Sequence, residues 1–169
     1  MPQNLELKAT ISSISEAEHI AEMLPAQRAG ILEQTDTYFN VKFGRLKLRE
    51  IAGQRCELIY YRRDEFSPSR LSNYDIVQVA DPVGLKRMLT DSIGVRTVVQ
   101  KTRLLFMHGT TRIHLDVVES LGNFIEFEVP VEGTREVADH KLLSLRSAFS
   151  IDDKACIAGS YVDLMEQMT

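Results

Sequence analysis

The stretch Arg45-Leu46-Lys47-Leu48-Arg49-Glu50 alternates charged and apolar side chains. Because successive side chains of a β-strand point to opposite faces, it predicts a strand with Arg45, Lys47 and Arg49 on one face and leucines on the other. Neighbouring like charges on one face repel each other, by roughly 3 kcal/mol for unit charges ~5 Å apart at an effective dielectric near 20. The cationic face is therefore expected either to lie in open solvent or to bind an anion.

Four other segments repeat this alternation of polar and apolar side chains. Their polar faces carry Asn4, Glu6 and Lys8; Lys101 and Arg103; Arg112, His114 and Asp116; and Glu126 and Glu128. One such strand on its own is typical of a solvated surface. Five of them in a chain that is 26% charged favour a shared polar environment inside the protein.

The same patterns predict eight strands. They cover residues 4–9, 34–41, 45–51, 56–63, 74–80, 97–106, 111–118 and 124–129. Residues 67–73 lie between two of these strands and contain serines, Pro68 and Arg70, a composition that predicts an exposed, mobile loop and a candidate lid.

Helices are predicted at four places. Residues 13–24 have apolar residues at helical spacing after a sequence that resembles a capping box. Asp81 and Pro82 mark the start of a second helix, which ends at Gly94 and is expected to bury Leu85, Met88 and Leu89. In the tail, residues 137–149 and 159–168 predict two helices that pack on the outside of the fold.

Eight strands in mostly hairpin order are enough to close a small barrel. If the apolar faces pointed inward, the helices would have no apolar surface to pack on. If the charged faces point inward, the helices cover an apolar exterior and the interior is a polar tunnel. The sequence therefore predicts an α+β fold, a closed eight-stranded antiparallel β-barrel with a charged interior and outer helices, as a single domain over residues 1–169.

Composition limits the classes of function. The net charge of -4 and the pI near 5.6 argue against a nucleic-acid partner, because such proteins carry a basic balance or stripe. Cys56 and Cys156 lack ligand-like spacing and are read as reduced core residues of a cytoplasmic protein. No segment reaches membrane-spanning length, so no membrane partner is expected.

Charges inside a barrel need partners, because removing them from water is costly. Guanidinium groups match phosphate oxygens, and the carboxylates of Glu6, Glu126 and Glu128 suit Mg²⁺ or Mn²⁺. The combination indicates a site for a nucleotide or polyphosphate. Simpler roles remain open for single residues: His114 in a hydrogen-bond network, and Tyr60 and Tyr61 in packing.

Several strings follow one another in a characteristic order. They are Leu5-Glu-Leu-Lys8, Gln34-Thr-Asp-Thr-Tyr-Phe39, Gly44-Arg-Leu-Lys-Leu-Arg-Glu50, Leu58-Ile-Tyr-Tyr61 followed by Arg63, Lys101-Thr-Arg103, Thr111-Arg-Ile-His-Leu-Asp116 with Glu119, Gly122-Asn-Phe-Ile-Glu-Phe-Glu128 and Ser160-Tyr-Val-Asp-Leu164. In sequence and order they resemble the CYTH superfamily of triphosphate tunnel metalloenzymes, most closely its class IV adenylate cyclase-like branch. This resemblance implies a tunnel that binds triphosphates with Mg²⁺ or Mn²⁺.

The resemblance also implies roles for individual residues. The expected phosphate-binding residues are Lys8, Arg45, Lys47, Arg49, Arg63, Lys101, Arg103 and Arg112. The expected metal ligands are Glu6, Glu126 and Glu128, with Asp116 as an additional ligand or a support for one. Lys8 and Tyr38 are the expected catalytic residues, because in hydrolytic members such residues position the attacking water.

One position departs from the family. Asn4 stands where the opening Glu-x-Glu-x-Lys signature has its first glutamate. This replacement removes a charge and is expected to weaken the site for a second metal ion.

The expected substrate is ATP, cyclised to cyclic AMP and pyrophosphate. The alternatives are hydrolysis of thiamine triphosphate or inorganic tripolyphosphate, and a non-catalytic sensor of a nucleotide or polyphosphate. A homodimer is compatible with the sequence, which leaves the oligomeric state open.

Overall fold

The computed structural model describes residues 2–63 and 69–168. Its strands are β1 (Gln3–Thr10), β2 (Gln27–Phe39), β3 (Arg45–Ile51), β4 (Arg55–Arg63), β5 (Ser69–Gln78), β6 (Val95–His108), β7 (Thr111–Val118) and β8 (Gly122–Pro130). Its helices are α1 (Ile14–Met23), α2 (Pro82–Ile93), α3 (Arg135–Ala148) and α4 (Tyr161–Gln167). Within the described ranges, no helix combines the length and the apolar character needed to cross a membrane.

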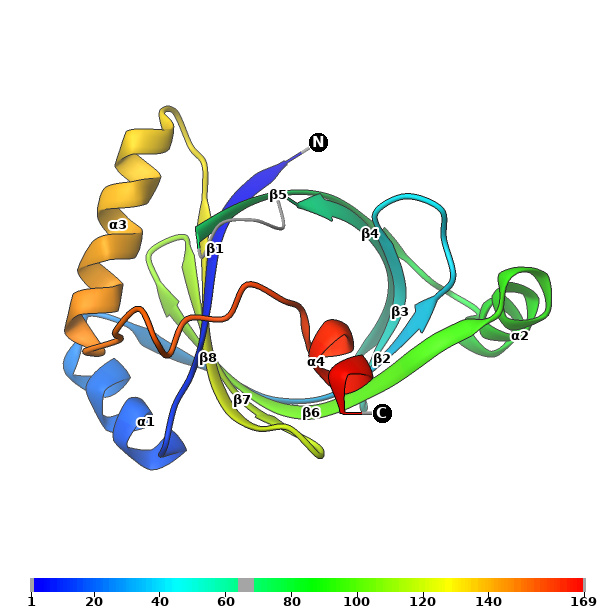
Figure 1. Ribbon diagram of the computed structural model, residues 1–169, viewed down its shortest axis with the longest axis horizontal. Helices are drawn as coiled ribbons and strands as arrows, with labels where there is room; N and C mark the ends of the chain where they lie inside the picture. The colour runs from blue at the N-terminus through cyan, green and yellow to red at the C-terminus, as the bar shows by residue number, and fades with distance from the viewer. Residues whose placement is uncertain (1, 64–68, 169) are drawn as a thin grey trace.

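The strands close into one barrel in which every neighbouring pair is antiparallel. Their order around the ring is β1-β5-β4-β3-β2-β6-β7-β8, and Figure 1 looks through this ring. Strand β1 lies between β5 and β8, so Leu5 is opposite Leu71 on one side and Val129 on the other. The predicted closed antiparallel barrel of eight strands is confirmed.

The largest hydrophobic cluster lies outside the barrel wall, beneath helices α1 and α3. Leu5, Leu7 and Ala9, on the outward face of β1, are at most 2% exposed and belong to one cluster with Ala17 of α1 and Leu142 of α3. Both helices cover the same side of the barrel in Figure 1. Burying each such leucine contributes about 1.5–3 kcal/mol, so packing against the helices favours the orientation that turns the charged faces inward.

Strand β5 corrects the predicted loop over residues 67–73. Its first residues pair with β1, and Arg70 lies opposite Glu6. The Arg70 side chain is buried, and its Nη2 donates to the carbonyl oxygen of Gly159 at 3.4 Å. The polar composition belongs to a strand that faces a polar interior, so the described part of this segment is not a lid. Residues 67–68 of the predicted loop lie outside the described residues.

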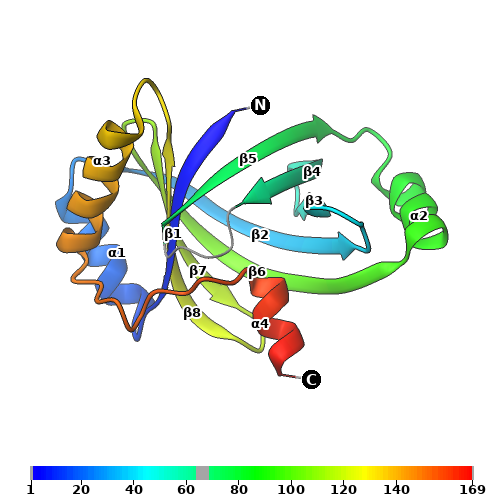
Figure 2. The ribbon, with the colours of Figure 1, turned by 45° about the horizontal axis from the view of Figure 1, so that its top comes forward.

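Helix α2 is present where it was predicted, but its expected buried stripe is partly wrong. Met88 is 64% exposed, whereas Leu85 and Leu89 are half-buried against a small cluster around Leu48 on the outer wall. Figure 2 shows α2 extending away from the barrel beyond the ends of β5 and β6. Because α2 contacts the wall through only one edge, most of its surface stays in solvent.

Helix α3 packs on the outside as predicted, but α4 does not. The segment before α4 follows the end of β1, where the amide of Ile157 donates to the carbonyl of Lys8 at 2.8 Å. It then brings Ser160 and Tyr161 to the interior of the barrel. In Figure 1 this segment and α4 cross in front of the ring. The final helix therefore closes part of one barrel mouth.

Candidate active site

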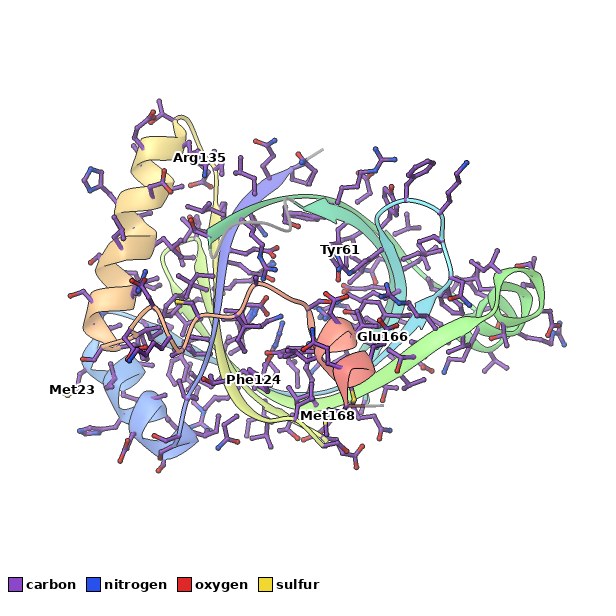
Figure 3. The ribbon with its side chains drawn as sticks, viewed as in Figure 1. Met23, Tyr61, Phe124, Arg135, Glu166 and Met168 are labelled. Carbon is purple, nitrogen blue, oxygen red and sulfur yellow. The ribbon has the colours of Figure 1, made fainter. Side chains whose placement is uncertain are left out.

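The barrel encloses a cavity of about 210 Å³. Side chains from all eight strands line it, together with Ser160 and Tyr161. Tyr61 of β4 projects into the ring in the view of Figure 3. Lysines and arginines outnumber carboxylates among the described lining residues, so the cavity favours an anion.

Four cations on β3 and β6 form what we call the cationic wall: Lys47, Arg49, Lys101 and Arg103. Strand β2 lies between these strands and contributes Asp36, which is 1% exposed. Arg49 donates two hydrogen bonds of 2.7 Å to the Asp36 carboxylate, and Lys47 Nζ donates a third at 3.0 Å. Burial raises the pKa of Asp36, but Arg49, Lys47 and Lys101 hold it well below its ordinary value. Asp36 is therefore an ionised counter-charge within the wall.

Arg103 is held by a second buried carboxylate. Its Nε and Nη2 donate to the two oxygens of Asp116 at 2.7 and 2.6 Å, and Tyr161 Oη donates to the same carboxylate at 2.8 Å. Burial raises the pKa of Asp116, but Arg103 and Lys101 lower it overall. Asp116 is 0% exposed and lies behind Arg103 rather than on the cavity surface, so the structure places this expected metal ligand in a supporting ion pair.

Glu6, Glu126 and Glu128 form the carboxylate wall, on the neighbouring strands β1 and β8. Glu6 lies opposite Glu128, and Lys8 lies opposite Glu126, with its Nζ 3.5 Å from a Glu126 oxygen. Burial raises the pKa of both β8 glutamates, but Lys8 lowers that of Glu126 and His114 lowers that of Glu128, so both end below the ordinary value. Two ionised carboxylates thus face the same cavity.

The two expected catalytic residues occupy different walls. Lys8 Nζ lies 3.8 Å from the centre of the Tyr161 ring, beside the carboxylate wall. Tyr38 is 4% exposed and accepts a hydrogen bond of 3.4 Å from Lys47, within the cationic wall. Both side chains line the cavity.

Arg45 faces the mouth that α4 covers. Its Nη2 donates to both oxygens of Asp163 at 3.0 and 2.8 Å, which ties α4 to β3. Burial raises the pKa of Asp163, but hydrogen bonds from Ser160 and the pairing with Arg45 bring it to about 2. Arg45 is thus engaged with a carboxylate and is not among the described residues that line the cavity.

The remaining expected phosphate ligands are Arg112 and Arg63, and the structure describes only the side chain of Arg112. Arg112 lines the cavity with a half-exposed side chain, and its Nη1 lies 3.5 Å from Glu128. The side chain of Arg63 lies outside the described part of the structure.

Several residues of the site were not identified from the sequence, among them Asp36, Tyr161 and Glu57. Asp36 and Tyr161 support the walls, and Glu57 lines the cavity while accepting hydrogen bonds from Arg55 and Gln78 at 2.6 and 3.0 Å. Strand alternation carried the signal for Asp36, because it shares the face of Tyr38. It carried the same signal for Glu57, which shares the face of Tyr61.

The other mouth of the barrel is partly apolar. Leu32, Ile51 and Leu105 line the cavity from β2, β3 and β6, at the end where β3 passes to β4. Leu32 lies opposite Arg103 in the β2–β6 register, so this apolar mouth adjoins the cationic wall directly. The cavity therefore has an apolar patch at this mouth, beside the charged side chains of Arg55 and Glu57, which also line it.

Solved structures of low identity share this fold. Protein PH1012 from Pyrococcus horikoshii is 21% identical with a TM-score of 0.87, and the match covers 95% of this chain and 98% of that one. A candidate adenylate cyclase from Vibrio parahaemolyticus is 17% identical with a TM-score of 0.82, covering 96% and 97%. A candidate adenylyl cyclase from Hippeastrum, described as having a dominant triphosphatase activity, is 18% identical with a TM-score of 0.62, covering 88% of each chain.

No curated protein sequence matches the chain significantly. The family profile described as the CYTH domain matches residues 2–161. This match spans nearly the whole described chain, including all eight strands and both walls of the cavity. The chain therefore belongs to the CYTH domain family.

Proposed function

We propose that this protein is a metal-dependent enzyme that acts on a triphosphate bound inside the barrel. The observation that carries the proposal is the presence of a cationic wall and a carboxylate wall in one cavity inside the barrel. Forked guanidinium groups recognise phosphate oxygens, and clustered carboxylates bind divalent cations. Membership of the CYTH domain family supports the same assignment.

The phosphates would lie along the cationic wall. Lys47, Arg49, Lys101 and Arg103 are the proposed ligands in this wall, and Lys8 and Arg112 reach the cavity from the side of the carboxylate wall. Arg45 and Arg63 remain proposed phosphate ligands. To bind phosphate, Arg45 would have to give up its hydrogen bonds to Asp163 and donate to phosphate oxygens instead.

The carboxylate wall fits Mg²⁺ or Mn²⁺. Glu6, Glu126 and Glu128 are the proposed ligands, because two of them are held ionised and all three line one cavity. The proposed role of Asp116 is to orient Arg103, with any contact to the ion indirect. When bound, the ion supplies electrostatic stabilisation of negative charge on phosphate oxygens.

We favour ATP as the substrate, with cyclic AMP and pyrophosphate as products. The apolar mouth formed by Leu32, Ile51 and Leu105 adjoins the cationic wall and suits the organic part of a nucleotide, which tripolyphosphate lacks. In this reaction the ribose 3′-hydroxyl attacks the α-phosphorus and pyrophosphate leaves. The walls would hold the triphosphate so that these atoms are in line.

Hydrolysis of thiamine triphosphate or tripolyphosphate is the alternative within the same site. Water would attack the terminal phosphorus, positioned by Lys8 and Tyr38, both of which line the cavity. The triphosphatase activity described for the Hippeastrum protein of the same fold favours this alternative. A non-catalytic sensor is the second alternative, which the uncharged Asn4 in the cavity supports.

The test is a panel of ATP, thiamine triphosphate and tripolyphosphate, each with Mg²⁺ or Mn²⁺. Cyclic AMP with pyrophosphate supports the cyclase, phosphate release supports the hydrolase, and binding without product supports the sensor. Arg112→Ala removes a half-exposed cation from the cavity and should weaken triphosphate binding, whereas Lys141→Ala, on the exposed face of α3, should not. Absence of thermal protection by every triphosphate would overturn the proposal.

A further inference from the structure

His114 is a buried histidine in the cavity that the proposed function leaves without a role. It lies on the inward face of β7, between Arg112 and Asp116 in sequence, and is 3% exposed. Its Nδ1 is buried and has no hydrogen-bond partner among the described residues. The nearest carboxylate oxygen recorded for this nitrogen, on Glu126, is 3.6 Å away, which is beyond hydrogen-bond distance.

The histidine is placed against two members of the carboxylate wall. Glu126 and Glu128 lie on β8, directly beside β7, and His114 is opposite Glu126 in the register. His114 Nε2 lies 3.9 Å from a Glu128 oxygen. One ligand atom from each of the three residues lies within 4.8 Å of the others, a spacing that a single ion can bridge.

The His114 ring is enclosed by the carboxylate wall and the cationic wall. It is 3% exposed and lies beside the β8 glutamates, one of which, Glu126, also accepts a hydrogen bond of 3.1 Å from Arg103. A neutral imidazole keeps a lone pair on one ring nitrogen, which is the form that binds metal ions. Nδ1, which is buried and has no hydrogen-bond partner among the described residues, lies on the Glu126 side of the ring, and Nε2 lies on the Glu128 side. The imidazole therefore places a nitrogen beside each of the two carboxylates.

We propose that His114 supplies a nitrogen ligand to the ion held by Glu126 and Glu128, and that the site consequently prefers Mn²⁺ to Mg²⁺. This inference rests on the proposed metal-dependent function. Mg²⁺ is a hard ion that takes oxygen ligands almost exclusively, whereas first-row transition ions accept imidazole nitrogen. A set of two carboxylates and one imidazole therefore discriminates between the two ions.

The first measurement uses the unaltered chain with Mn²⁺ alone. Calorimetry should give Mn²⁺ an affinity at least about tenfold above that of Mg²⁺. Electron spin-echo spectroscopy of the bound Mn²⁺ should show ¹⁴N modulation, which should change to the ¹⁵N pattern when the protein is labelled with ¹⁵N-histidine. This second readout needs no substitution, so it holds even if a variant fails to fold.

The variant His114→Gln keeps a polar side chain of similar length but removes the imidazole. It should lose the histidine modulation and about tenfold or more of its Mn²⁺ affinity, while Mg²⁺ affinity changes much less. His140→Gln, which removes an exposed histidine of α3, is the matched control and should behave like the unaltered chain.

The outcomes separate this inference from the proposed function. Mn²⁺ binding with no nitrogen modulation, or modulation that persists in His114→Gln, would overturn the role of His114 while leaving the carboxylate metal site intact. Failure of both ions to bind the unaltered chain would overturn the metal site itself, and with it this inference.

Discussion

The sharpest test of the polar interior is Asp36→Asn. Asp36 pairs with Arg49 at 2.7 Å, Lys47 at 3.0 Å and Lys101 at 3.7 Å. At an effective dielectric near 20, each pair corresponds to roughly 4–6 kcal/mol of attraction. Most of this attraction is offset by the desolvation of the charges and by repulsion among the three cations. Removing one partner of a buried pair leaves the others uncompensated and costs about 3–5 kcal/mol. We expect a loss of this size in the free energy of unfolding.

The assay is urea denaturation with thermal melting as a second readout. At about 2–4 °C per kcal/mol for a chain of this size, Tm should fall by roughly 6–20 °C. Tripolyphosphate should recover more stability in Asp36→Asn than in the unaltered protein, because the variant lacks a carboxylate that competes for the same cations. Saturation at 100 times Kd adds about 2.7 kcal/mol, enough to be visible in either readout.

Asp75→Asn is the matched control, since it makes the same chemical change at an exposed position on β5. Its effect should stay within about 0.5 kcal/mol. If Asp36→Asn is no more destabilising than this control, Asp36 does not stabilise the cationic wall. If tripolyphosphate stabilises the variant and the unaltered protein equally, Asp36 does not compete with phosphate for these cations.

Three further predictions concern the metal site, the α4 contact and a turn. Asn4→Glu adds a carboxylate to the cavity and should raise Mn²⁺ affinity in calorimetry; unchanged Mn²⁺ and Mg²⁺ titrations would argue against a ligand at this position. Because the pKa of Asp163 is lowered to about 2, its pairing with Arg45 stabilises the protein above the unfolded pKa of about 3.9 and is lost as pH falls through about 2. The stability difference between the unaltered protein and Asp163→Asn, from urea denaturation, should therefore shrink between pH 5 and pH 2. Gly44→Ala should be more destabilising than Gly53→Ala in urea denaturation. Both glycines have positive φ, so placing alanine at either position costs about 1–2 kcal/mol of backbone strain. Only at Gly44 would the new Cβ also lie 2.7 Å from a backbone oxygen, that of Tyr61. Equal losses would mean that the turn relaxes to accept the Cβ.

The sequence was most informative where a strand alternates without interruption. In Arg45–Ile51 the period of two assigns each side chain to a face, and the apolar stripes of the helices decide which face is inside. The orientation of the charged faces was predictable for this reason. The first part of β2 was missed because a bulge between Arg28 and Gly30 interrupts its alternation.

The polar interior also misled the sequence-based prediction. Serines and Arg70 at the start of β5 have the composition of a loop, although they form a strand whose polar side chains are buried in the fold. The pairing of Asp36 with Arg49 and Lys47 depends on the register between β2 and β3, which local patterns do not specify. Tyr161 reaches Asp116 only because the chain after α3 crosses the barrel mouth.

The position of β1 between β5 and β8 has a consequence for biosynthesis. Strand β1 is translated before either of its partner strands. Its two edges are both paired only after Leu71 of β5 and Val129 of β8, the residues opposite Leu5, have been made. Such distant pairings slow folding, and until β8 is made the incomplete ring has two open edges that invite aggregation. Nascent chains that stall before residue 122 should therefore depend on chaperones, whereas chains released after β8 can close their own ring.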